Sequence, residues 1–195
     1  MVMLSVAGVL GPMACAREGG ELPAVLAGIP LTDQDGNAVG AAELAGKPLL
    51  VNFMFTSCSV VCGRQTQALE DARAALPEAV RNRVRFLSVS VDPANDDATA
   101  LKRFAGRHGA DVPGWSFVRS DELNTQQLTL RMAAFEPGSG ARPPPSAHTL
   151  GLYLFDREGR LVQRYAGSPI DVARISRELV ALHELNTSEA RLASR

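Results

Sequence analysis

A nearly continuous apolar run at residues 49–55 (LLVNFMF) is the feature that most constrains how this chain can fold. A strand buried on both faces of a sheet has this kind of composition. A helical pattern follows from about residue 59 to residue 76, and residues 84–91 (VRFLSVSV) are rich in β-branched side chains, which favour a strand. A doubly buried strand, a helix and a second strand in succession indicate an α/β domain.

The rest of the chain continues this alternation. The pattern predicts a hairpin around the Asp-Gln-Asp-Gly turn of 29–37, a helix opened by 92–97, a strand at 115–118, a helix at 122–135, a Pro/Gly-rich loop at 136–147, a hairpin of 149–156 with 161–165, and an amphipathic helix at 169–183. The order is a hairpin, then β-α-β-α-β-α, then β-β-α. This layout predicts a thioredoxin-like α/β fold, a three-layer sandwich with an additional N-terminal β-hairpin.

Length and charge set the domain organisation. The chain has 195 residues and a formal net charge of −1. This is enough for one domain with a substantial core, which we place at 29–185, between a linker at 17–28 and a flexible tail at 186–195. A nearly neutral chain lacks the basic footprint of a nucleic-acid-binding protein, and no apolar stretch reaches the roughly 18 residues of a membrane-spanning helix.

The N-terminus predicts export. Residues 1–13 are apolar and uncharged, and Ala14-Cys15-Ala16 fits a small-x-small cleavage pattern, so residues 1–16 are interpreted as a signal peptide. The alternatives are a lipid anchor on Cys15, which would attach the chain to a membrane, and a cytoplasmic protein whose start is misassigned. We expect a periplasmic protein or one on the outer face of the inner membrane. Without residues 1–16 only Cys58 and Cys62 remain, which leaves no structural disulfide framework and reserves both cysteines for function.

Cys58 and Cys62 lie four residues apart, directly after the buried strand. On one helical face this spacing separates the Cβ atoms by about 5–6 Å, whereas a relaxed disulfide requires about 3.5–4.5 Å. A metal held by two sulfurs at about 2.3 Å each requires them roughly 4 Å apart, which Cys side chains on consecutive turns can provide. The spacing favours a soft metal ion over rapid disulfide exchange, although exchange and a pair of inert buried cysteines remain alternatives. The helix start at Cys58 favours the thiolate, the form that binds metal and attacks disulfides.

His148 is the candidate third ligand. In a thioredoxin-like domain the residue entering the strand after the Pro-rich loop faces the start of the first helix, so His148 can complete a site of two thiolates and one imidazole. Two sulfurs suit Cu(I), and an added nitrogen helps to hold Cu(II), although zinc accepts the same ligands. A lone His is more often structural, and we interpret His108, near a helix C-terminus where it can bond the last carbonyls, and His183, at the end of the last helix, in that way.

These features together resemble the Sco/SenC family of copper-binding, thioredoxin-like proteins, over about residues 31–181. The resemblance rests on the segments LTDQDG (31–36), GKP (46–48), FTSCSVVC (55–62), SVDP (90–93), PGWSF (113–117) and His148-Thr149 before a strand. It implies that Cys58, Cys62 and His148 are copper ligands. Two departures stand out: Gly63 replaces the Pro that many members have after the second Cys, and the loop at 136–147 is unusually rich in proline. Asp92 matches the family's acidic residue, and we assign it to turn and helix N-cap chemistry.

The resemblance implies a metallochaperone that binds and transfers copper rather than turning over a substrate. Its partners would be the copper-accepting subunit of a respiratory cytochrome c oxidase, whose dinuclear copper centre it would help to assemble by delivering copper, by reducing the client cysteines, or both, and an upstream copper donor. The alternative is a thiol–disulfide reductase of exported proteins, with Cys58 attacking and Cys62 resolving. A peroxiredoxin-type peroxidase fits less well, because no Pro precedes Thr56 in the expected Pro-Thr-x-x-Cys pattern.

Overall fold

The structure, a computed structural model, describes residues 21–58, 60–140 and 142–193, with side chains described as far as residue 185. The expected signal peptide and Cys15 therefore lie outside the described residues. The described chain forms a mixed sheet of order β2-β1-β5-β4-β3-β6-β7. The strands are β1 (Leu31–Asp33), β2 (Ala38–Val39), β3 (Leu49–Met54), β4 (Arg85–Ser90), β5 (Trp115–Arg119), β6 (Leu152–Phe155) and β7 (Leu161–Tyr165).

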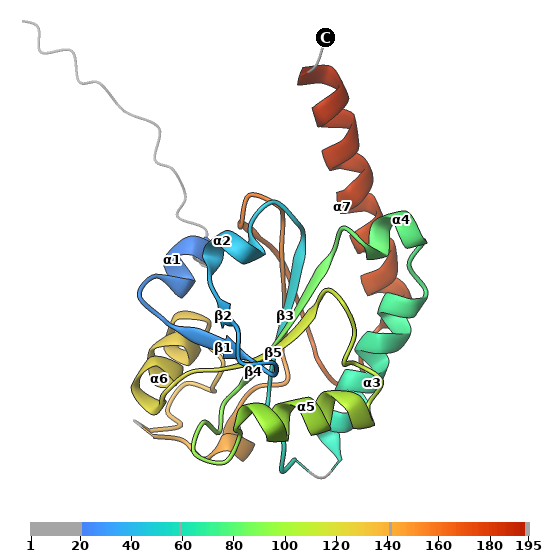
Figure 1. Cartoon of the computed structure of the whole chain (residues 1–195). Helices are drawn as coiled ribbons and strands as arrows, with labels where there is room; N and C mark the ends of the chain where they lie inside the picture. Colours follow the sequence, from blue (N-terminus) through green and yellow to red (C-terminus); the bar gives the residue numbers. More distant parts are fainter. Residues whose placement is uncertain (1–20, 59, 141, 194–195) are drawn as a thin grey trace, which may run out of the picture.

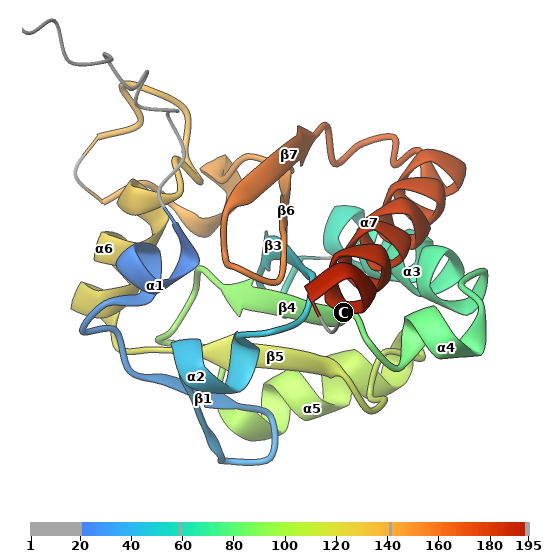
Figure 2. The same cartoon turned by 90° about the horizontal axis from the view of Figure 1, so that it is seen from above.

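Helices cover both faces of this sheet (Figures 1 and 2). They are α1 (Leu22–Leu26), α2 (Ala41–Leu44), α3 (Val61–Ala74), α4 (Glu78–Arg81), α5 (Ala98–Arg107), α6 (Glu122–Arg131) and α7 (Val172–Ala193), with a 3₁₀ turn at Pro145–Ala147. The buried side chains of α3, α4, α5 and α7 form one apolar core with the sheet, and those of α1, α2 and α6 form a second core on the opposite face. This arrangement confirms the three-layer thioredoxin-like fold with its N-terminal hairpin.

The central strand β3 behaves as its composition predicts. All six of its residues are buried, with Leu50 and Met54 in one core and Val51 and Phe53 in the other. Its one polar residue, Asn52, donates to Gln65 Oε1 at 3.0 Å and accepts from Ser88 Oγ at 2.8 Å. The amide is therefore satisfied inside the core, as a buried polar group must be.

Three boundaries differ from the sequence-based prediction. The expected linker at 17–28 contains α1, whose Leu22, Val25 and Leu26 are buried against the sheet, because its apolar residues are spaced for one helical face. Helix α6 ends at Arg131 rather than near residue 135, since Ala133 takes a positive φ of 50°. Helix α7 continues to Ala193, so the expected tail from residue 186 is helical as far as that residue; its Ala, Glu, Leu and Arg content favours a helix. No helix in the described parts of the chain is long and apolar enough to cross a membrane.

The strand directions bring distant segments to one edge of the sheet. β3 and β4 are parallel, so the loops that follow them, carrying Cys58 and Asp96, leave from the same edge. β6 pairs antiparallel with β3, so the segment that precedes it, which ends with His148-Thr149-Leu150, arrives at that edge too. Ligands of open α/β sheets bind outside the carboxyl ends of the parallel strands, which makes this edge the place to look for a site.

Candidate metal centre

The two cysteines do not share a helical face. Cys58 lies in the loop between β3 and α3, and only Cys62 lies within the helix, which begins at Val61. The expectation of thiols on consecutive helical turns is therefore wrong, because Val60, with φ −136° and ψ −55°, takes the N-cap position after Cys58. The pair is close nonetheless: the Cys62 backbone N–H donates to Cys58 Sγ at 3.2 Å. Since Val60 offers no side-chain cap, the Cys58 sulfur accepts one of the unpaired N–H groups at the helix start.

The two thiols differ in environment. Cys58 is half-buried, whereas Cys62 is only 1% exposed. Burial raises the pKa of the Cys62 thiol well above its usual range, and its neighbour Cys58 and the charge of Asp96 add to this effect, while the Phe55 backbone opposes it. In the metal-free chain Cys62 therefore keeps its proton, which a metal ion must displace before the sulfur can act as a thiolate ligand.

A buried carboxylate, Asp96, lies behind the cysteine loop. It is fully buried and accepts hydrogen bonds from the Thr56 backbone N–H at 3.1 Å, from Thr56 Oγ1 at 2.5 Å and from Ser90 Oγ at 2.5 Å. Burial raises its pKa, although these donors oppose the shift. The bonds to Thr56 fix the end of β3 two residues before Cys58. Sequence reasoning missed Asp96, because nothing in the sequence distinguishes it from the neighbouring Asp92 and Asp97.

The two flanking acids have local roles. Asp92 accepts from Asn95 Nδ2 at 2.9 and 3.0 Å, which closes a turn. Asp97, rather than Asp92, caps α5 by accepting from the Ala100 backbone N–H at 2.7 Å. The predicted role of Asp92 in a turn therefore agrees with the structure. Its predicted role as a helix N-cap is wrong, because Asp97 is the N-cap of α5.

His148 presents one ring nitrogen without a partner. The ring is 8% exposed, and Nδ1 lies 2.6 Å from the Pro145 carbonyl. That contact requires a proton on Nδ1, so the neutral ring carries its lone pair on Nε2. Nε2 is buried and has no hydrogen-bond partner among the described residues. Burial lowers the pKa of His148, opposed by the Pro145 and Phe53 carbonyls, which favours the neutral, metal-binding form.

Two contacts connect His148 to the cysteine segment. Its ring meets the Phe55 ring edge-on, with centroids 5.7 Å apart, and Phe55 O accepts the Cys58 N–H at 3.2 Å. Gln65, one turn after Cys62 in α3, donates through Nε2 to the Leu150 carbonyl at 2.9 Å and the Gly167 carbonyl at 3.2 Å. Among the described residues, however, no three His, Cys, Asp or Glu side chains lie together as a ready metal-binding group. The structure thus connects the segments carrying the predicted ligands without assembling the ligands around one point.

His108 lies beside the cysteines, which the sequence did not predict. The sequence predicts that His108, the C-cap residue of α5, bonds the last carbonyls of that helix. Within the described part of the chain its ring makes no such hydrogen bond. Its ring instead packs on Phe104, with centroids 4.6 Å apart, and against Gly63 in the first turn of α3. His108 and Cys58 line the same shallow surface depression. Burial, together with the charge of Arg107, lowers the pKa of His108.

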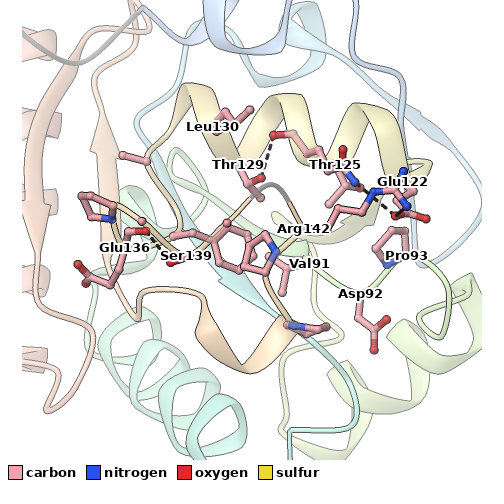
Figure 3. A pocket seen from close by; sticks show the side chains of 18 of the residues that line it. Val91, Asp92, Pro93, Glu122, Thr125, Thr129, Leu130, Glu136, Ser139 and Arg142 are labelled. Atoms are coloured by element: carbon pink, nitrogen blue, oxygen red, sulfur yellow. Dashed lines mark hydrogen bonds and ion pairs between the residues drawn. The ribbon is translucent and has the colours of Figure 1, made fainter.

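A larger cavity is lined by the Pro-rich loop and helix α6 (Figure 3). Its volume is about 470 Å³. Thr125 and Thr129 of α6 lie on one side, opposite Asp92 and Pro93, and the loop closes the remainder. Pro145, whose carbonyl holds the His148 ring, belongs to the lining. The Pro-rich loop thus both walls this cavity and sets the orientation of His148.

The comparisons with known proteins identify the family. The model of the SCO1/SenC family matches residues 23–184. The chain belongs to the SCO1/SenC family. A curated relative, the SCO1 protein homolog of Bacillus subtilis (strain 168), is 28% identical over 136 residues, which cover 69% of this chain and 70% of the relative.

Solved structures of the family share the fold. A SCO1/SenC family lipoprotein from Bacillus anthracis str. Ames is 26% identical, with a TM-score of 0.67 over 79% of this chain and 92% of that one. BsSco, described as having a disulfide switch and as a member of the Sco family of cytochrome c oxidase assembly proteins, is 25% identical, with a TM-score of 0.67 over 80% and 91%. Bradyrhizobium japonicum ScoI, solved with copper bound, is 23% identical, with a TM-score of 0.66 over 84% and 98%, and supports the fold alone.

Proposed function

We propose that this chain is an exported metallochaperone that carries copper on Cys58, Cys62 and His148 and supports assembly of the dinuclear copper centre of a respiratory cytochrome c oxidase. The observation that carries the proposal is the buried Nε2 of His148, which has no partner in the described structure while Nδ1 is held by Pro145. An unsatisfied buried polar atom costs about 1–3 kcal/mol. A metal ion on Nε2 would remove that cost.

The donor set suits copper. Two thiolates are soft ligands that select Cu(I), and an imidazole extends the set toward Cu(II). The Pro145 carbonyl would hold the ring of a ligating His148 in one tautomer, as hydrogen bonds to the second nitrogen of metal-bound histidines do. Copper itself would draw together donors from two segments that Gln65 already ties to each other. Binding would release the Cys62 proton to solvent.

The surface around Cys58 suits transfer to another protein. Val60 and Val61, which follow the cysteine loop, are 49% and 40% exposed. These two neighbouring valines place apolar surface next to Cys58, where a partner protein could cover it. We place the oxidase subunit that accepts copper on this surface, and the protein outside the cytoplasm, as the lipoprotein relative of Bacillus anthracis suggests.

Thiol–disulfide exchange is the second candidate function. Cys58 is accessible and Cys62 is buried directly behind it, the arrangement of an attacking thiolate and a resolving thiol. A client disulfide would gain two electrons and two protons, and Cys58 and Cys62 would become a disulfide. The description of BsSco as having a disulfide switch supports redox chemistry within the family.

One experiment separates the two functions. Purified reduced protein is loaded with Cu(I) or left metal-free, and each form is mixed with the copper-accepting domain of an oxidase whose two cysteines are either reduced or joined in a disulfide. Copper delivery predicts that the loaded form metallates the reduced domain. Reductase activity predicts that the metal-free form converts the oxidised domain to dithiol. If the wild type fails to bind one copper per chain, the metallochaperone proposal is wrong.

A further inference from the structure

A second imidazole lies on the solvent side of the cysteine pair. A surface depression of about 340 Å³ is lined by Cys58, Val60, Gly63, Arg64, Gln67 and His108. Cys58 is half-buried, whereas Cys62 and His148 are 1% and 8% exposed. A metal ion arriving from outside therefore meets Cys58 before it meets either of the other two proposed ligands, and it meets Cys58 in a depression that also contains a histidine.

The absence of a side chain at position 63 makes room for this histidine. A Cβ added to Gly63 would lie 2.7 Å from His108 Cε1 and 3.1 Å from His108 Nε2. Contacts under 3.0 Å essentially never occur for real Cβ atoms, so any larger residue would force the ring to move. In the sequence, Gly63 stands out only as a departure from the proline that many family members have at this position. The structure adds a positive reason, because Gly63 lets the His108 ring lie against the first turn of α3.

The ring is positioned but its nitrogens are free. Phe104 packs on it with centroids 4.6 Å apart, which limits its orientation. Within the described residues, neither ring nitrogen makes a hydrogen bond to a protein group. Because the ring is only partly buried, its nitrogens remain available to a metal ion that enters the depression. The two remaining polar side chains of the depression, Arg64 and Gln67, are exposed.

We propose that Cys58 and His108 form a two-coordinate loading site through which Cu(I) reaches and leaves the inner ligands. The inference rests on the proposed copper function and adds a route to it. Cu(I) is satisfied by two soft or borderline donors, and a thiolate with an imidazole is such a pair. The step is a ligand exchange without change of oxidation state. The Cu–N bond to His108 breaks, a Cu–S bond to Cys62 forms, Cys58 remains bound throughout, and the Cys62 proton passes to solvent.

The test uses a variant that keeps the packing and removes the nitrogen. His108→Phe retains an aromatic ring against Phe104, and His183→Ala, in α7, is the control. Cu(I) is transferred from its bicinchoninate complex to reduced protein, and the loss of the chelate absorbance gives both the rate and the equilibrium. We expect His108→Phe to load at least about tenfold more slowly than wild type, a change of about 1.4 kcal/mol in the barrier, with its Cu(I) affinity at equilibrium unchanged. The control should match wild type in both.

X-ray absorption tests the ligation directly. The double variant Cys62→Ser/His148→Ala retains only Cys58 and His108 of the four donors. With a limiting amount of Cu(I), its copper should show one sulfur and one imidazole nitrogen, and adding His108→Phe should remove the nitrogen. Wild-type loading rates in His108→Phe, or a copper spectrum that does not change when His108 is replaced, would overturn the loading site. Such a result would leave the proposed function standing, since that function fails only if wild type itself does not bind copper.

Discussion

The inner and outer sides of the cysteine pair are built in different ways. The inner side, Cys62, Asp96 and His148, is buried, and its polar groups are fixed by backbone and hydroxyl partners. The outer side, Cys58, Gly63 and His108, is partly exposed, and its His108 ring is positioned by a glycine and an aromatic contact rather than by hydrogen bonds within the described residues. A rigid, desolvated inner side suits retention of a metal, and an open outer side suits its exchange. We therefore expect the inner side to determine the copper affinity and oxidation state, and the outer side to determine the rate of copper transfer.

The largest effect should come from the cysteines, which bridge the two sides. Cys58→Ser or Cys62→Ser should each weaken Cu(I) binding by more than about a thousandfold, because a neutral hydroxyl is a poor ligand for a soft ion. Competition with a chromophoric Cu(I) chelator measures this. Ser57→Ala, which changes an exposed neighbour, should bind as wild type does. Stoichiometric, tight copper in the double cysteine variant would contradict the site.

Removing His148 should change the oxidation state that the protein can hold. Without the imidazole, two thiolates can still hold Cu(I) nearly linearly, so we expect His148→Ala to lose only about tenfold in Cu(I) affinity. Cu(II) prefers more nitrogen donors, so the thiolate-to-Cu(II) absorption of the wild type should disappear. The absorption spectrum after addition of Cu(II) is the measurement, with His108→Phe as the matched variant on the outer side. If that spectrum disappears in His108→Phe and survives in His148→Ala, the two sides have been assigned the wrong way round.

Asp96 tests whether the inner side depends on a buried carboxylate. Asp96→Asn replaces an acceptor of three hydrogen bonds by a group that also donates, and should lower the free energy of unfolding at pH 7 by about 1–3 kcal/mol. Urea unfolding of reduced, metal-free protein measures this, and Asp97→Asn, which changes the exposed cap of α5, is the control.

The pH dependence of that difference follows from the direction of the pKa shift. Burial raises the pKa of Asp96 in the folded state, so the folded protein takes up this proton at a higher pH than the unfolded chain. The contribution of Asp96 to stability should therefore rise as pH falls from 7 toward the unfolded pKa of about 3.9 and stay level below it. The advantage of wild type over Asp96→Asn should grow along the same range. A difference that shrinks on acidification would show that hydrogen bonding outweighs burial at this carboxylate.

What could be predicted from the sequence also divides between the two sides. The apolar run of β3 and the strand–helix alternation were enough to predict the sheet, and the resemblance pointed to Cys62 and His148. The sequence placed Cys58 at the start of the helix, but it could not predict that Val60 takes the N-cap position and leaves Cys58 in the preceding loop, since exact helix boundaries are the least predictable part of a helix. Asp96 and His108 were missed for a related reason. Each contacts the cysteine segment from another loop or helix, Asp96 through Thr56 and His108 through Gly63, and no local pattern marks such a contact.

The smallest effect should be the coupling between Gly63 and His108, which tests whether the outer side is built as a pair. Alanine favours a helix over glycine by about 1 kcal/mol. In wild type this gain is opposed, because the new Cβ would lie 2.7 Å from His108 Cε1. In a His108→Ala background the opposing ring is absent. Gly63→Ala should therefore leave wild type equally stable or less stable and should stabilise His108→Ala, with a coupling energy of about 1 kcal/mol.

Urea unfolding of the four proteins, reduced and metal-free, gives this cycle. Gly106→Ala in α5 is the matched control, since a Cβ at that glycine would meet nothing within 4 Å, and its effect should be the same with or without His108. Equal effects of Gly63→Ala in both backgrounds would mean that the ring yields at no cost. The first turn of α3 would then impose no position on His108, and the outer side would lack the built geometry that distinguishes it from any exposed histidine near a cysteine.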